Sequence, residues 1–191
     1  MNLRQLLLFL CLILPAQVLR SQQSVGDDDI NASQKSCRVI QMTLNARERM
    51  RASGDVPGDD DFTAGATGKA GVYSKQLLQM AHQYPRDWNH GNAVFYGNFV
   101  LGRIAIQQGS VKQAGQYLLA AGATEGSPQL DSFGPNMTLA KELLEKGHSQ
   151  VVLEYFALCQ KFWENGRPKL DEWSSAVRGG EVPDFGPNLE Y

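Results

Sequence analysis

The stretch AVFYGNFVLGRIAIQQGSVKQAGQYLLAAG, residues 93–122, contains two helix-forming segments that a Gly-Ser pair separates. Residues 93–106 are apolar on nearly every face, which is typical of a helix that is buried all round. Gly109 favours the end of that helix, and Ser110 is a suitable N-cap for a second helix over residues 111–122. The stretch therefore predicts a helical hairpin whose first member is the central helix of the domain.

Helical patterns also lie on both sides of this hairpin. Apolar residues recur at helical spacing over residues 70–83, and again over 137–147 and 149–163, which Gly147 separates. A short last helix is expected over residues 170–178. No alternating strand pattern is visible in this region, so the fold class is predicted to be all-α.

The two hairpins match each other, because their turn glycines lie 38 residues apart, at positions 109 and 147. The matched positions are Leu101, Gly102, Ala114, Leu118 and Ala121 in the first hairpin and Leu139, Ala140, Val152, Phe156 and Cys159 in the second. This pattern resembles the tetratricopeptide (TPR) family of helix-turn-helix repeats. The resemblance implies stacked antiparallel helical hairpins, a TPR-like α-solenoid fragment with a groove for a peptide or a partner protein.

The resemblance also implies which side chains face that groove. On the first hairpin they are Tyr96, Phe99 and Arg103, and on the second Lys141 takes the place equivalent to Arg103. Two cations beside aromatic surface could hold a carboxylate of the partner, or that of the chain's own Glu190. The alternative is that Phe99 belongs to the core and both cations are solvated.

Polar residues cluster at the start of the central helix, between Trp88 and Asn98. Asn89 and Asn92 share one face, and Asn98 sits among apolar neighbours. A buried asparagine needs hydrogen-bond partners, so it either braces the fold or contacts a ligand. A small-molecule binder or an enzyme with its site here is therefore the alternative to a partner-binding scaffold.

No other arrangement of residues suggests a catalytic or metal-binding site. The histidines show no metal-ligand spacing, and no phosphate loop, nucleophile elbow or carboxylate pair is visible. No catalytic residue, metal or cofactor is therefore predicted, and the main expectation is a non-enzymatic protein.

The tetrapeptide Phe-Gly-Pro-Asn occurs twice, at residues 133–136 and 185–188. In the first copy, Gly134 and Pro135 predict a turn, and Asn136 predicts an N-cap for the helix that follows. In the second copy, Phe185 and Leu189 are expected to dock on the domain and close the open end of the stack. The alternative is that this tail is a mobile recognition peptide.

The N-terminal residues indicate export. Residues 1–22 read as a signal peptide, with Arg4 before an apolar run over residues 6–14 that is too short to span a bilayer. Cleavage is expected between Ala16 and Gln22, which gives a periplasmic or extracellular protein without stable membrane insertion. Residues 23–69 form a polar segment with room for a helix over 34–51 and an acidic Gly/Asp-rich loop over 54–68. The helical domain is expected over 70–180 and the docked tail over 181–191.

The net charge narrows the class of partner, and the cysteines raise the question of a disulfide. The whole chain has a formal net charge of −2, and residues 1–22 contain two arginines and no acidic residue, so the exported chain is more acidic still. Such a protein has no electrostatic basis for binding nucleic acid, and a protein or peptide partner is expected. Cys37 and Cys159 could form a disulfide in an oxidising compartment, but Cys159 as a small buried residue is favoured.

Overall fold

The computed structural model describes residues 60–190, and every regular element in that part of the chain is helical. The predicted signal peptide, the predicted helix over 34–51 and Cys37 lie outside the described residues. The helices are α3 (Asp60–Gln83), α4 (His90–Gln107), α5 (Val111–Gly122), α6 (Pro128–Phe133), α7 (Thr138–Glu145), α8 (Ser149–Cys159) and α9 (Arg167–Arg178), with the short 3-10 helices η1 (Glu164–Gly166) and η2 (Gly186–Leu189). The all-α prediction is confirmed for residues 60–190.

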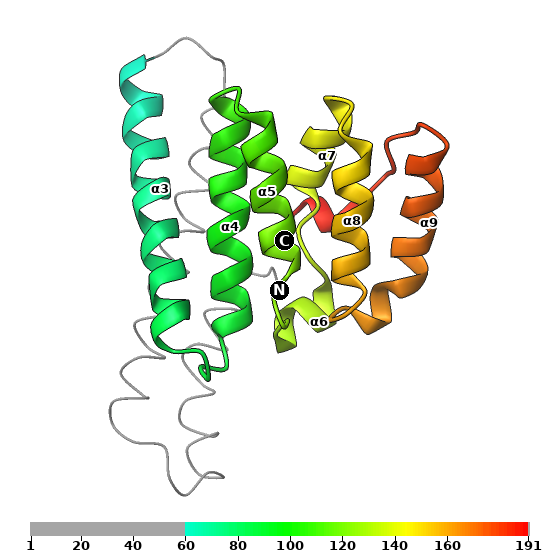
Figure 1. The fold of residues 1–191 in the computed structure, drawn as a ribbon, viewed down its shortest axis with the longest axis horizontal. Helices are drawn as coiled ribbons and strands as arrows, with labels where there is room; N and C mark the ends of the chain where they lie inside the picture. Colours follow the sequence, from blue (N-terminus) through cyan, green and yellow to red (C-terminus); the bar gives the residue numbers. More distant parts are fainter. Residues whose placement is uncertain (1–59, 191) are drawn as a thin grey trace, which may run out of the picture.

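The long helices lie side by side in chain order, and successive ones run in opposite directions (Figure 1). α3 forms one edge of this row and α9 the other. α4 lies between α3 and α5, and most of its residues are buried, as expected of a central helix. Among the described residues, no helix is both long and apolar enough to cross a membrane.

α3 begins earlier than the sequence predicts. A loop is expected over residues 54–68, but residues 60–68 are helical and belong to α3. Gly65 and Gly68 each weaken a helix by about 1 kcal/mol relative to alanine, which hides the helical signal of this segment. Asp60 and Asp61 favour the helix, because acidic residues are stabilising at a helix N-terminus.

Three helices end in the same way, at a glycine with a positive φ. After α4, the Gly109 N–H donates to Ile106 O at 3.0 Å and the Ser110 N–H donates to Ala105 O at 2.8 Å. The same pair of bonds follows α7 at Gly147 and α9 at Gly180, and the three φ values are 73°, 81° and 85°. This is the Schellman motif, which satisfies carbonyls that a helix end leaves open. α4, α7 and α9 all end at the same side of the row (Figure 1).

The connection between α5 and α7 contains a helix where the sequence predicts only a loop. Ser127 caps α6, since its Oγ accepts a hydrogen bond from the Leu130 N–H at 3.1 Å, and Pro128 occupies the first turn. Asn136 supports the start of α7, because its Oδ1 accepts from the Thr138 N–H at 2.9 Å. Met137, rather than Asn136, occupies the N-cap position itself.

Two glycines let α4 approach its neighbours closely. A Cβ at Gly97 would lie 2.7 Å from Leu78 Cγ of α3, and a Cβ at Gly102 would lie 2.3 Å from Leu139 Cδ2 of α7. A side chain at either position would push the neighbouring helix away. The close packing of these helices explains why glycine, which is unfavourable inside a helix, stands at both positions.

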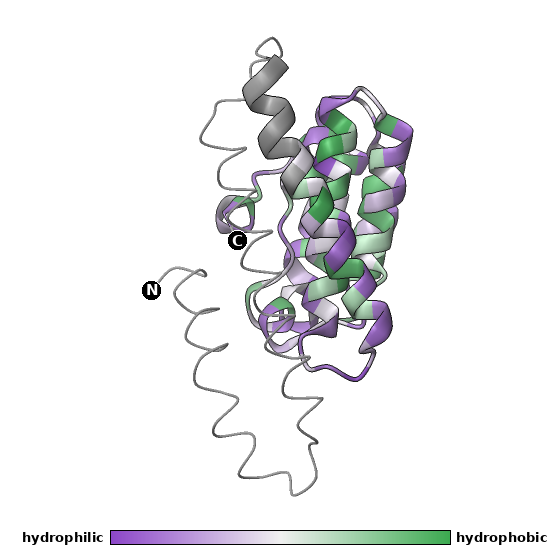
Figure 2. Cartoon of the chain, turned by 90° about the vertical axis from the view of Figure 1, so that its left-hand side faces the viewer, coloured by the Kyte–Doolittle hydropathy of each residue, from purple (hydrophilic) through white to green (hydrophobic). Residues whose placement is uncertain are grey.

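The tail after α9 turns back along one side of the row of helices. In Figure 1 it passes behind α8 and reaches the start of α7, and the edge-on view of Figure 2 shows its end beside the row. Phe185 is buried, with its ring 5.0 Å from that of Trp173 and 6.2 Å from that of Phe156. The sequence predicts a docked tail that covers the open end of the stack. In the structure the tail contacts Trp173 of the last helix, and η2 also lies against the α6–α7 turn, where the Met137 N–H donates to Asn188 O.

Candidate functional site

The aromatic residues of the predicted groove lie in the core. Tyr96 is 4 % exposed and Phe99 is 1 % exposed, and the Phe99 ring stacks on that of Phe95 at 6.0 Å. Helical spacing alone cannot separate a groove face from a core face when the helix is apolar all round. These two side chains therefore offer a partner almost no surface in this structure.

Arg103 does bind a carboxylate, and that carboxylate belongs to α7. Arg103 Nη2 and Nε donate to Glu142 Oε1 at 2.8 and 3.0 Å, and Nε also lies 3.3 Å from Oε2. Both side chains are largely buried, so this ion pair fastens α4 to α7. Lys141 is more exposed and lies 3.9 Å from Glu145, one turn further along its own helix.

The asparagines at the start of α4 form a polar cluster with the α5–α6 loop. Asn92 Nδ2 donates to Asn89 Oδ1 at 2.6 Å and to Gln129 Oε1 at 2.9 Å. Ser127 Oγ donates to Asn92 Oδ1 at 2.6 Å. Asn89 and Asn92 are fully buried, so the cluster braces α4 against α6. Asn98 stands apart, because its Nδ2 donates to Val94 O of the same helix at 2.9 Å.

Beside this cluster, the backbone of α4 lies unusually close to that of the α5–α6 loop. A Cβ at Gly91 would lie 1.6 Å from Gly126 O, and Thr124 Oγ1 donates to Gly91 O at 3.0 Å. Gln129 Nε2 is buried and has no hydrogen-bond partner within the described part of the chain. The predicted polar site is therefore a packed junction between α4 and α6.

Cys159 is the one cysteine among the described residues, and it is a buried free thiol. Burial raises the pKa of this thiol far above its usual value. Burial also raises the pKa of Tyr155, and the neighbouring Cys159 contributes to that shift. A thiol that stays protonated is a poor nucleophile, so Cys159 is suited to packing rather than to catalysis.

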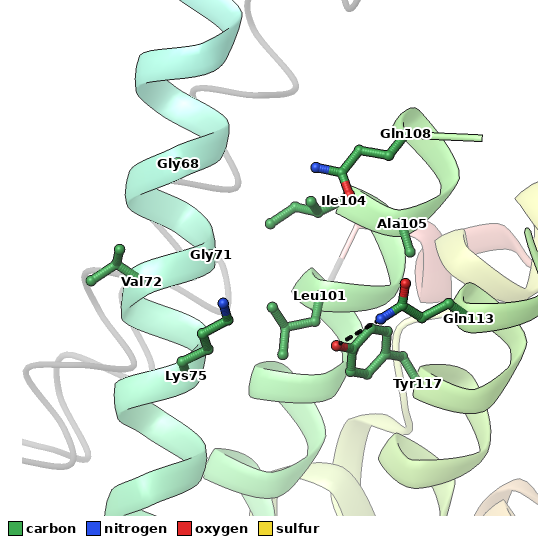
Figure 3. Close-up of a pocket in the computed structure, with 10 residues that line it drawn as sticks. All are labelled: Gly68, Gly71, Val72, Lys75, Leu101, Ile104, Ala105, Gln108, Gln113 and Tyr117. Atoms are coloured by element: carbon green, nitrogen blue, oxygen red, sulfur yellow. Dashed lines mark hydrogen bonds between the residues drawn. The ribbon is translucent and has the colours of Figure 1, made fainter. Parts of the chain in front are cut away.

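A hollow of about 480 Å³ lies between α3, α4 and α5 (Figure 3). Its walls include Leu101 and Ile104 of α4 and Tyr117 of α5, and α3 contributes Gly68, Gly71 and Lys75. The Lys75 side chain reaches from α3 into the space between α3 and α4 (Figure 3). Gly68 and Gly71 carry no side chain, so the α3 wall leaves room that a larger residue would fill.

Sequence reasoning missed the hollow, and one signal was available. Gly68 and Gly71 are spaced to lie on nearly the same face of a helix, but the first was assigned to a loop. Glu142 was also missed, although it follows Lys141 directly in the sequence.

No group of His, Cys, Asp and Glu within residues 60–190 could hold a metal ion. Comparisons with models of known families, with curated proteins and with solved structures found no match. The candidate site therefore rests on the geometry of the hollow alone.

Proposed function

We propose that the protein is an exported, non-enzymatic helical-repeat scaffold that binds a short segment of a partner protein. The hollow between α3, α4 and α5 is the observation that carries this proposal, because it combines an apolar floor with a polar rim. Export is supported by the signal-like pattern of residues 1–22.

The repeated helix ends support the TPR-like part of the proposal. The Schellman bonds after α4 and α7 fall on positions 38 residues apart, which is the offset between the two hairpins in the sequence. The same bonds after α9 suggest that α9 corresponds to the first helix of such a unit. Each helix-turn-helix unit would then present its first helix in the same orientation, as repeat scaffolds do.

The hollow fits one kind of occupant best. Leu101, Ile104 and Tyr117 give the hollow an apolar lining, and burying apolar surface is the main source of affinity at protein interfaces. Gln108 and Gln113 at the rim can bond to backbone groups of a bound segment. Lys75 favours an acidic side chain at one edge. The expected ligand is therefore a short amphipathic peptide segment with an acidic residue next to its apolar ones.

The test is a substitution that fills the hollow and is expected to leave the fold unchanged. A Cβ at Gly71 makes only ordinary contact with Ile104 Cδ1, at 3.6 Å, so Gly71→Leu places a leucine in the hollow. Gln79→Leu is the matched control, because it adds the same side chain to an exposed position of α3 that does not line the hollow. Gly71→Leu also removes a helix-interior glycine, which favours folding by up to about 1 kcal/mol.

A random peptide display library is then selected on the unchanged chain. We expect the enriched peptides to bind the unchanged chain and the Gln79→Leu variant, and to lose at least tenfold in affinity for Gly71→Leu. The enriched peptides should share an acidic residue near apolar ones, and Lys75→Glu should weaken their binding. Equal binding to the Gly71→Leu variant would remove the hollow as the binding site.

A further inference from the structure

The tail is held by the rest of the domain in the way a receptor holds a peptide. Asn188 Nδ2 donates to Phe133 O and to Pro135 O, both at 3.1 Å. The Met137 N–H donates to Asn188 O at 2.8 Å. Asn136 Nδ2 and Thr138 Oγ1 each donate to Leu189 O at 3.3 Å. The second Phe-Gly-Pro-Asn copy is therefore bound by the first.

The surface that receives the tail is built from side chains that lie outside it. Phe156 and Trp173 make an aromatic pocket in which Phe185 is 1 % exposed. Trp163 stacks beside Trp173 and supports the turn at Gly134. A Cβ at Gly134 would lie 2.5 Å from the Trp163 ring and 2.8 Å from Asn188 Nδ2, so glycine is needed to admit the asparagine.

The surface that binds the tail, here called the receptor, consists of residues 133–138 together with Phe156, Trp163 and Trp173. It selects for particular side chains as well as binding backbone groups. The Asn188 amide supplies its hydrogen atoms to two carbonyl oxygens, and an aspartate at this position would place a carboxylate against them. Phe185 fills a pocket that a smaller residue would leave open. The chemical class of the ligand is thus a Phe-Gly-Pro-Asn-Leu segment, read at its phenylalanine and its asparagine.

The segment that joins α9 to this ligand is exposed. Glu181, Val182 and Asp184 are all exposed, and the Gly180 and Glu181 amides bond back to α9 rather than to the receptor. The bound part begins only at Phe185. The contacts of Phe185 and Asn188 would therefore be the same if the segment came from another molecule.

We propose that the receptor also takes the Phe-Gly-Pro-Asn-Leu segment of a second copy of this chain, so that two copies exchange tails. Every copy carries both the receptor and its ligand, which makes the exchange reciprocal and closed. Within one copy the short connection gives the tail a high effective concentration, so the intramolecular form dominates in dilute solution. Concentration, or a shorter connection, shifts the balance to the exchanged dimer.

The first test offers the ligand as a peptide to a full-length chain with a defective tail. The chain carries Phe185→Ala and Asn188→Asp, and the probe is the peptide EVPDFGPNLEY, residues 181–191, with a fluorescent label. We expect saturable binding to this variant and at least tenfold weaker binding to the unchanged chain, whose own tail competes. A peptide with the same Asn→Asp change should not bind. If the variant folds but does not bind the unmodified peptide, the proposal is overturned.

The second test covers the case in which that variant does not fold. Deleting Val182 and Pro183 shortens the connection by about 7 Å but leaves every residue of the receptor and of the bound segment in place. We expect this deletion to form a dimer by light scattering, and the deletion combined with Asn188→Asp to remain a monomer. A deletion variant that stays monomeric at high concentration would contradict tail exchange, and so would a dimer that persists with Asn188→Asp.

Discussion

The two Phe-Gly-Pro-Asn copies have the same four residues and different surroundings. In the first copy the glycine, proline and asparagine are buried and the phenylalanine is half-buried. In the second copy the phenylalanine and asparagine are buried, and the glycine and proline are exposed. Gly134 adopts φ 81° and ψ 170°, whereas Gly186 begins a 3-10 helix with φ 51°. A short sequence therefore specifies a turn, while the place where it docks decides which of its residues carry the stability.

The phenylalanine pair should show the largest difference. Phe185→Ala removes a fully buried ring from the Phe156–Trp173 pocket and should lower the free energy of unfolding by about 3–5 kcal/mol. Phe133→Ala removes a half-buried ring and should cost only about 1–2 kcal/mol. Urea unfolding followed by circular dichroism measures both values. Equal losses would mean that the pocket contributes no more than ordinary surface packing.

For the glycine pair, substitution in the first copy should cost more stability than substitution in the second, which is the reverse of the phenylalanine pair. Gly134→Ala forces a Cβ into the Trp163 ring in a backbone region that only glycine adopts readily, and should cost about 2–4 kcal/mol. A Cβ at Gly186 meets nothing within 4 Å, so Gly186→Ala carries only the strain of its positive φ, about 1 kcal/mol. Thermal unfolding of the two variants at matched concentration provides the comparison. A larger loss for Gly186→Ala would contradict the assigned contacts.

The asparagine pair tests the hydrogen bonds between the copies. Asn188→Ala removes the hydrogen bonds that Asn188 donates to the buried turn, to Phe133 O and Pro135 O, and should cost about 2–3 kcal/mol. Asn136→Ala removes a local bond to the Thr138 amide and a long bond to Leu189, with an expected cost of about 1 kcal/mol. The double variant should lose less than the sum, because both residues hold the same segment. Strict additivity would show that the two side chains act independently.

The proline pair should differ least. Pro187 is exposed, so Pro187→Ala mainly increases the freedom of the unfolded chain and should cost at most about 1 kcal/mol. Pro135 is buried, and Pro135→Ala should cost about 1 kcal/mol more through lost packing. Both values come from the same urea series. A costly Pro187→Ala would place Pro187 in a contact that this structure does not contain.

The helices and their ends were largely predictable from sequence, because their signals are local. Gly109 and Gly147 mark turns by their position after helical patterns, and both adopt a positive φ at the end of a helix. The start of α3 was missed because Gly65 and Gly68, which are unfavourable in a helix, conceal its helical pattern. α6 was missed because six residues are too few to show a period.

The candidate sites depend on contacts between distant residues, which the sequence does not display. The repeated tetrapeptide predicts a docked tail, but no local rule pairs Asn188 with the carbonyls of Phe133 and Pro135. Similarly, Arg103 predicts a carboxylate partner, and only the packing of α4 on α7 selects Glu142. Tyr96 and Phe99 were assigned to a groove because an apolar helix gives no sign of which face is covered.

The bonds from Asn188 to the turn before α7 join two points of the chain that lie more than fifty residues apart. In an open row of helices, the last one has a single neighbour and frays before the others. Here Trp173 of α9 packs against Phe185 of a segment that is fastened at the start of α7, so separating α9 from α8 also breaks this contact. Residues 133–189 should therefore open as one cooperative unit, with the amides of α9 exchanging hydrogen as slowly as those of α7.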